Sequence, residues 1–223
     1  MSRLYVYAVV GAPARGLGRG LSGRPLRLVR CGGVLAVVSA RDAAPAVTPA
    51  NLRAHDAIVR RLATKVDALL PARFGSLVDD ERALHEALAP RAVELGQALA
   101  LVAGCEQMTL RVYGRARPWD EAGADAVPAG VGPGARYLVR RFRALRVPEI
   151  EPLRRALGGL VRAERAERHG TPPLIASVYH LVPRGRTRAY RAAILEVRAR
   201  LGDVSVRASG PWAPYAFAPE ALG

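Results

Sequence analysis

Aromatic side chains, cysteine and lysine are all scarce in this chain. Aromatic residues make up 5% of the 223 positions, which is a poor supply of rings for stacking against nucleic acid bases. All but one of the 34 basic residues are arginine, the exception being Lys65. With the abundant Ala and Gly, this bias indicates a GC-rich coding sequence. The net charge of +15 is therefore weak support for a nucleic acid partner, although five arginines cluster within residues 136–146.

Cysteine and long apolar runs are too few to suggest a disulfide framework or a membrane span. Neither Cys31 nor Cys105 belongs to a CxxC pair or a cluster with histidine, which favours two reduced thiols over a zinc site of about four ligands. No uninterrupted apolar run reaches the roughly 18 residues that a spanning helix needs. The opening residues alternate like a strand, and no small-residue cleavage site follows them. We therefore expect a cytoplasmic protein with no membrane partner.

Local catalytic motifs are also absent. The chain contains no GxSxG elbow, Walker loop or HExxH sequence, so we predict no catalytic residues, cofactor or metal site, and no enzymatic activity. The sequence Gly16-Leu-Gly18-Arg-Gly20 is similar to a dinucleotide-binding loop, but such a loop must open directly into a helix. Here another strand pattern follows Pro25, which favours a flexible loop. An active site assembled from distant residues remains open.

The first half of the chain mixes strand and helix patterns. Gly32 and Gly33 separate two apolar runs and favour a hairpin, and Thr48-Pro49 is a typical helix start. On the following apolar stripe, His55 is expected to be a packed histidine with one hydrogen bond. Apolar patterns predict strands at 4–10, 26–30, 34–39, 70–75 and 108–113, and helices at 49–69 and 79–103, the second interrupted at Pro90. The resulting order β-β-β-α-β-α-β suits a sheet with two helices on one face.

The second half begins after a stretch rich in glycine and proline at residues 114–134, which we interpret as a linker. It divides an N-terminal domain at 1–113 from a C-terminal domain at 135–223. In the second domain we expect a helix at 137–145, a helical piece from Leu153 that becomes charged through His169, a strand at 174–182, a helix at 190–201 and a strand at 204–208. The proline-rich tail after it should be extended and packed against this second domain.

Several local patterns together resemble the GvpF/GvpL gas vesicle family. The two most specific are Pro71-Ala-Arg73-Phe74-Gly75 and the tail Gly210-Pro-Trp212-Ala-Pro-Tyr215-Ala-Phe217. Weaker matches in the same order are 4–10, 35–39, 55–59, 106–112 and 137–138. Departures such as Asp56 and Ala213 leave the choice between GvpF and GvpL open.

The resemblance implies an α+β fold of two domains. The first is a ferredoxin-like sheet with helices on one face, and the second is a smaller α/β domain with an extended C-terminal tail. It also implies a non-enzymatic, chaperone-like role in vesicle formation. Its partners would be the small, very hydrophobic shell protein and other gas vesicle accessory proteins. The alternative from another class is a basic nucleic-acid-binding protein, which the low aromatic content and scattered arginines disfavour.

The candidate structural or partner-binding residues are Arg73, Phe74, Trp212, Tyr215 and Phe217. The tail aromatics are anchors of the kind that dominate interfaces, but the tail could equally be a clasp across its own domain. For Arg73 and Phe74, packing at a domain interface is favoured over direct contact with a partner.

Overall fold

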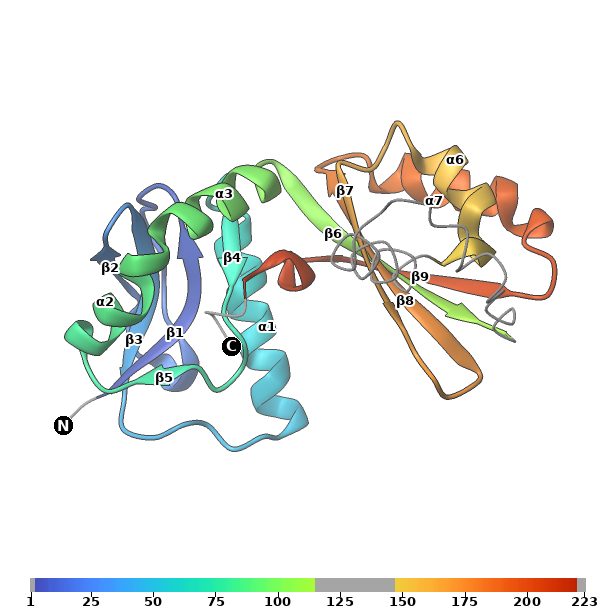
Figure 1. The fold of residues 1–223 in the computed structure, drawn as a ribbon. Helices are drawn as coiled ribbons and strands as arrows, with labels where there is room; N and C mark the ends of the chain where they lie inside the picture. Colours follow the sequence, from blue (N-terminus) through green and yellow to red (C-terminus); the bar gives the residue numbers. More distant parts are fainter. Residues whose placement is uncertain (1–2, 115–146, 220–223) are drawn as a thin grey trace, which may run out of the picture. The chain divides into compact units, whose positions relative to one another are not determined.

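The structure, a computed structural model, describes residues 3–114 and 147–219 of the chain. It contains two compact units (Figure 1). The first unit comprises Met1–Gln107 and Pro211–Gly223, and the second comprises Met108–Gly210. Apart from Gly114, the linker expected at 114–134 lies outside the described residues, as does the helix expected at 137–145.

The first unit is built on an antiparallel sheet. Its strands are β1 (Arg3–Val10), β2 (Arg27–Cys31), β3 (Val34–Arg41), β4 (Leu69–Pro71) and β5 (Leu77–Val78). Their order is β2-β3-β1-β4, with β5 also pairing with β1. The predicted hairpin joins β2 to β3, and Gly32 in its turn has a φ of 61°, which glycine adopts without a steric penalty.

The helices of the first unit are α1 (Pro49–Ala63), α2 (Glu81–Leu88) and α3 (Ala92–Val102). Helix α1 begins as predicted, because the Thr48 hydroxyl accepts a hydrogen bond from the Asn51 amide at 3.2 Å. It ends earlier than predicted, since Leu69 is taken into β4. Pro90 lies in the 3-10 turn Ala89–Arg91 between α2 and α3, so the predicted interruption is confirmed.

These helices are divided between the two faces of the sheet rather than placed on one. Tyr5 and Tyr7 share a core cluster with Ile58, Val59 and Leu62 of α1. A separate set of leucines from α2 and α3 is equally buried but lies outside that cluster: Leu84, Leu88, Leu95 and Leu99. The reason is visible in β1, where every residue after Arg3 is buried, as expected of a strand covered on both faces.

The second unit is another antiparallel sheet with helices. Its strands are β6 (Cys105–Tyr113), β7 (Ala163–Arg168), β8 (Leu174–Pro183) and β9 (Ser205–Trp212), in the order β7-β8-β6-β9. Helices α6 (Glu151–Leu157) and α7 (Thr187–Val197) contribute Leu153, Leu157, Tyr190 and Ile194 to its core. Short 3-10 turns at Pro148–Ile150 and Arg198–Arg200 flank these helices. The predicted two-domain α+β class is therefore confirmed.

Two sequence expectations fail in this unit. The strand predicted at 108–113 belongs to the second sheet, not the first. The charged stretch through His169, predicted as helix, is strand β7, which pairs with β8 from Ala163↔Leu181 to Arg168↔Ala176. Its Ala, Glu and Arg residues favour helix locally, but the main-chain hydrogen bonds offered by the edge of β8 outweigh that preference.

Candidate functional site

All five candidate residues lie in the first unit, although they come from distant parts of the sequence. Arg73 and Phe74 follow β4, Trp212 ends β9, and Tyr215 and Phe217 lie in the 3-10 turn η5 (Tyr215–Phe217). This turn contacts β4. The expectation that the tail packs against the second domain is therefore wrong from Pro211 onward, because these residues belong to the first unit, where Tyr215 packs against the core cluster that includes α1. Ser209 and Gly210 remain in β9 of the second sheet.

The tail is held by both apolar and polar contacts. Phe217 is 1% exposed and Ala213 is 4% exposed, and Ala213 belongs to the same core cluster as Tyr5 and Tyr7. The Ala216 amide donates a hydrogen bond of 2.8 Å to Oε1 of Gln107. Phe217 therefore packs within the first unit and helps to hold the tail there.

Trp212 and Tyr215 differ from Phe217 because both remain half-exposed. The guanidinium carbon of Arg60 lies 4.4 Å from the Trp212 ring centroid, and Arg60 also forms an ion pair of 2.7 Å with Asp56. Burial raises the pKa of the Tyr215 hydroxyl, and the Asp56 carboxylate raises it further while Arg60 opposes both effects. Tyr215 therefore stays a neutral hydrogen-bonding group at physiological pH.

The Phe74 and Arg73 side chains differ in their burial and their contacts. The Phe74 ring is half-buried and meets the His55 ring edge-on, with centroids 5.7 Å apart. Arg73 is exposed. Packing thus accounts for Phe74, whereas Arg73 is presented to solvent.

Behind Phe74 lies a buried polar cluster that sequence reasoning recognised only in part. His55 is 3% exposed and bonds through both ring nitrogens, to the Tyr5 hydroxyl at 3.0 Å and the Ala72 carbonyl at 3.3 Å. The prediction of a packed histidine with one hydrogen bond therefore missed the second bond. Burial lowers the pKa of His55, partly offset by the Ala72 carbonyl and the Asp56 carboxylate.

The glycine-rich loop after β1 is not arranged like a phosphate-binding loop. Lys65 donates a hydrogen bond to the Gly16 carbonyl, and Arg61 donates to the Arg19 carbonyl. A phosphate loop instead directs backbone amides toward its ligand. Leu17 and Leu21 in this loop are buried, so it is anchored to α1 rather than flexible as expected.

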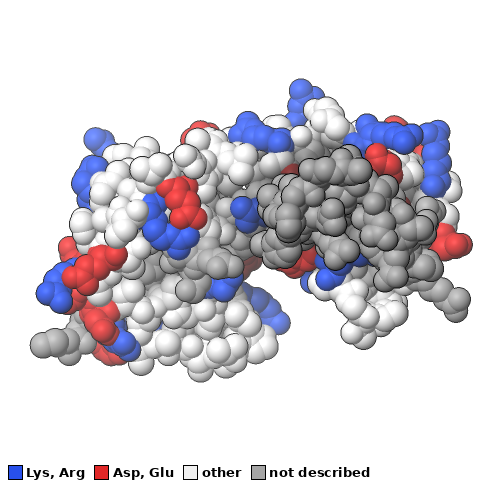
Figure 2. All heavy atoms as spheres, in the orientation of Figure 1, with Lys and Arg blue, Asp and Glu red and all other residues white. Residues whose placement is uncertain are grey.

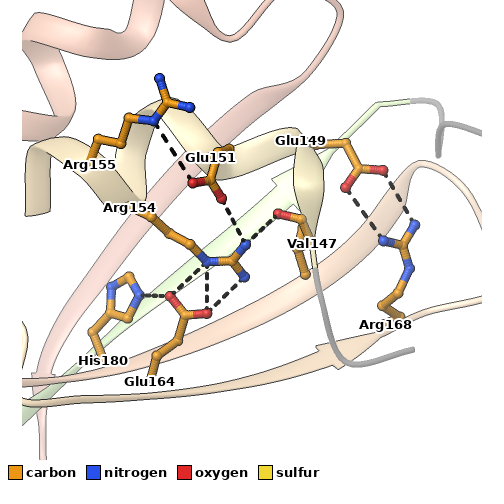
Figure 3. Close-up of polar contacts among 8 residues, drawn as sticks. All are labelled: Val147, Glu149, Glu151, Arg154, Arg155, Glu164, Arg168 and His180. Carbon is orange, nitrogen blue, oxygen red and sulfur yellow. Dashed lines mark hydrogen bonds and ion pairs between the residues drawn. The ribbon is translucent and has the colours of Figure 1, made fainter. Parts of the chain in front are cut away.

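The second unit contains a separate cluster of ionisable residues, shown in Figure 3. Arg154 of α6 donates two hydrogen bonds, of 3.0 and 2.8 Å, to Oε1 of Glu164 on β7. His180 of β8 bonds to Oε2 of Glu164 at 2.8 Å and to the hydroxyl of Tyr190 on α7 at 2.7 Å. Burial raises the pKa of Glu164, but the bonds to His180 and Arg154 outweigh burial and hold that pKa at about 2.

This cluster joins four elements of the second unit. Because both ring nitrogens of His180 are already bonded, the arrangement supports packing and does not offer a base to a substrate. The strand register explains it, since Glu164 lies directly opposite His180. A nearby ion pair links Arg168 to the buried Glu149 at 3.3 Å (Figure 3).

The described residues form neither a metal-binding cluster nor a membrane-spanning helix. Across 3–114 and 147–219, no group of three or more His, Cys, Asp or Glu side chains could hold a metal ion. Within the same residues, no helix is long and apolar enough to cross a membrane. In the view of Figure 2, Lys and Arg are interspersed with acidic and uncharged residues.

Known proteins resemble this chain along nearly its whole length. The family model "Gas vesicle synthesis protein GvpL/GvpF" matches residues 3–219. A Streptomyces protein described as gas vesicle protein L is 30% identical over 250 aligned positions, covering 96% of this chain and 92% of its relative. Gas vesicle protein F2 of Halobacterium salinarum is 28% identical, covering 80% of this chain and 73% of that protein.

Solved structures show the same fold. The crystal structure of GvpF from Anabaena has a TM-score of 0.72 at 18% identity, covering 98% of this chain and 97% of that one. GvpF from Microcystis aeruginosa also has a TM-score of 0.72 at 18% identity, covering 97% of this chain and 99% of that one. The agreement of family model, sequence relative and fold leads to one conclusion: the chain belongs to the GvpL/GvpF family of gas vesicle proteins.

Proposed function

We propose that this chain is a non-enzymatic assembly factor that binds the hydrophobic shell protein of the gas vesicle in the cytoplasm and supports vesicle formation. The observation that carries this proposal is the family match across residues 3–219. Shell subunits must expose apolar surface before they assemble, and such surface aggregates unless another protein covers it. Other gas vesicle accessory proteins are further partners in this scheme.

The contact region we propose is the aromatic face of the first unit, defined as Arg60, Arg73, Phe74, Trp212 and Tyr215. Interfaces draw most of their binding energy from Trp, Tyr and Arg side chains that are partly buried and become desolvated in the complex. In the aromatic face, Phe74, Trp212 and Tyr215 are partly buried, and Arg60 and Arg73 are exposed. Phe217 is excluded from it, because a side chain that is 1% exposed has no surface left to offer a partner.

A capture experiment with purified shell protein tests this function. The full chain should retain the shell protein, and Trp212→Ala should weaken retention about tenfold or more, as expected for an interfacial aromatic anchor. Tyr113→Ala is the matched control, since Arg207 lies 5.4 Å from the Tyr113 ring centroid in the second unit. If neither the wild type nor Tyr113→Ala retained the shell protein, this result would contradict the proposal.

Salt distinguishes this proposal from nucleic acid binding. Capture through apolar and aromatic contacts should persist as salt is raised from about 50 to about 200 mM, whereas phosphate binding falls steeply over that range. A steep loss of shell-protein retention, accompanied by tight binding of a DNA duplex at low salt, would favour the nucleic acid alternative.

A further inference from the structure

A continuous chain of hydrogen bonds connects α1 to the segment 72–76 that carries Arg73 and Phe74. The Ala72 carbonyl can only accept, so Nε2 of His55 must be the donor in the 3.3 Å bond between them. The Gly75 amide donates to the Tyr5 hydroxyl oxygen at 3.0 Å. When His55 is neutral, its proton lies on Nε2, and Nδ1 accepts from the Tyr5 hydroxyl, 3.0 Å away.

All three bonds are satisfied when His55 is neutral. In the neutral tautomer with the proton on Nε2, each donor in this set of hydrogen bonds has an acceptor, and both ring nitrogens are hydrogen-bonded. Two of these hydrogen bonds involve the backbone of Ala72 and of Gly75, which lie on either side of Arg73 and Phe74 in the sequence. The Phe74 ring also rests edge-on against the His55 ring.

We propose that neutral His55 is the positioning residue that fixes the segment 72–76 for partner binding, and that protonation of its ring loosens the segment. The binding part of this inference rests on the proposed function. The part that concerns the order of the segment does not, because it can be measured on the protein alone.

Protonation of His55 disturbs this set of hydrogen bonds, because it adds an N–H donor at Nδ1 that the set cannot accommodate. With a proton on Nδ1, the Tyr5 oxygen must accept from both His55 and Gly75, and its own hydroxyl proton then needs a new acceptor. Tyr5 is fully buried, where a donor without an acceptor is unfavourable. The bond from Gly75 is the one that can yield, because it lies in a loop and not in a strand or helix.

The groups around His55 act in opposite directions. Burial is the largest effect and lowers the pKa of His55, while the Ala72 carbonyl and the Asp56 carboxylate raise it. Burial also raises the pKa of Tyr5, so its hydroxyl stays protonated throughout. The titratable and charged groups near the ring and its partner Tyr5 include Tyr7 of β1, Arg41 of β3, Asp56 of α1 and Tyr215 of the tail. Arg60 of α1 is the ion-pair partner of Asp56.

The decisive variant is His55→Gln. A glutamine amide can donate to the Ala72 carbonyl and accept from the Tyr5 hydroxyl, so it can replace both bonds without titrating. His180→Gln is the matched control, because His180 is also buried and bonded through both ring nitrogens but lies in the second unit. Tyr5→Phe removes the link between His55 and Gly75.

The first measurement is amide hydrogen exchange across residues 72–76, from about pH 8 to about pH 4. The range extends below the ordinary histidine pKa of about 6.5 because burial lowers the pKa of His55. After correction for intrinsic rates, wild type and His180→Gln should lose protection at Gly75 as pH falls, and His55→Gln should not. Tyr5→Phe should be unprotected at every pH. Acid-induced loss in His55→Gln equal to wild type would overturn the proposal. If that variant does not fold, wild-type exchange that rises uniformly through the first unit, rather than in 72–76, would do the same.

The second measurement is retention of the shell protein over the same pH range. Wild-type affinity should fall on acidification by at most about tenfold per pH unit, the limit for one linked proton, while His55→Gln should show a flat profile. A wild-type profile identical to that of His55→Gln would contradict the link to binding. If no variant binds at any pH, the proposed function fails, and the exchange measurement still decides the role of His55.

Discussion

The guanidinium of Arg60 lies over the ring of Trp212, 4.4 Å from its centroid, and so joins α1 to the C-terminal tail. The pair brings together residues 152 positions apart in the sequence (212 − 60). A cation over an exposed indole contributes about 0.5–1 kcal/mol. Since both side chains are part-exposed, we predict that Arg60→Ala lowers the free energy of unfolding by about 1 kcal/mol or less. Urea denaturation measures it, and Arg53→Ala on the same helix is the control.

Phe217 should matter far more for stability than Trp212. Phe217 is 1% exposed, and replacing a buried phenylalanine by alanine costs about 3–5 kcal/mol. We predict that Phe217→Ala shows this loss in urea denaturation. Trp212→Ala should cost less, because its ring is only half-buried. A loss for Phe217→Ala no larger than that for Trp212→Ala would contradict this prediction.

The turn between β2 and β3 should accept alanine at one glycine and not at the other. Gly32 has a φ of 61°, and a Cβ added there would lie 3.2 Å from the Cβ of Ala92. A Cβ added at Gly33 would meet nothing within 4 Å. We predict that Gly32→Ala lowers the free energy of unfolding by about 1 kcal/mol or more and that Gly33→Ala is nearly neutral. Similar melting temperatures for both variants would contradict this.

Glu164 should make the second unit sensitive to acid. Its pKa is lowered from 4.5 to about 2 in the folded chain, so the folded state stabilises the ionised form. This contribution is fully present above the unfolded pKa of about 4.5 and is lost as pH falls toward 2. We predict that Glu164→Gln reduces stability near neutral pH and flattens the acid-induced loss between these values, measured by circular dichroism. An unchanged acid transition would show that Arg154 and His180 do not stabilise the carboxylate.

In the cell, the proposed function predicts a specific defect. Deleting the gene from a vesicle-forming host should abolish or strongly reduce vesicles, without affecting growth in shaken culture. Wild type supplied in trans should restore vesicles, and Trp212→Ala should not, if the aromatic face contacts the shell protein. Normal vesicle numbers in the deletion strain, counted by electron microscopy, would contradict an assembly role.

Much of the local structure could be predicted from the sequence because it depends on neighbours in the chain. Thr48-Pro49 starts α1, Pro90 separates α2 from α3, and Gly32 allows the hairpin turn. Each effect arises within a few residues, through a cap, a missing amide or a positive φ. The family could also be identified from the two motifs around Phe74 and Trp212.

Tertiary structure alone decided how those pieces combine. The stretch Ala163–Arg168 has helix-forming residues, yet it is a strand because β8 offers it an unpaired edge. The tail from Pro211 onward follows the second unit in sequence but belongs to the first, because the apolar cluster that includes Ala213 and packs against Tyr215 is formed by elements far away in the chain. The role proposed for His55 likewise depends on Tyr5, Ala72 and Gly75. No spacing in the sequence predicts that these residues lie close together. Local patterns determine which elements can form, whereas long-range packing and hydrogen bonding select their partners.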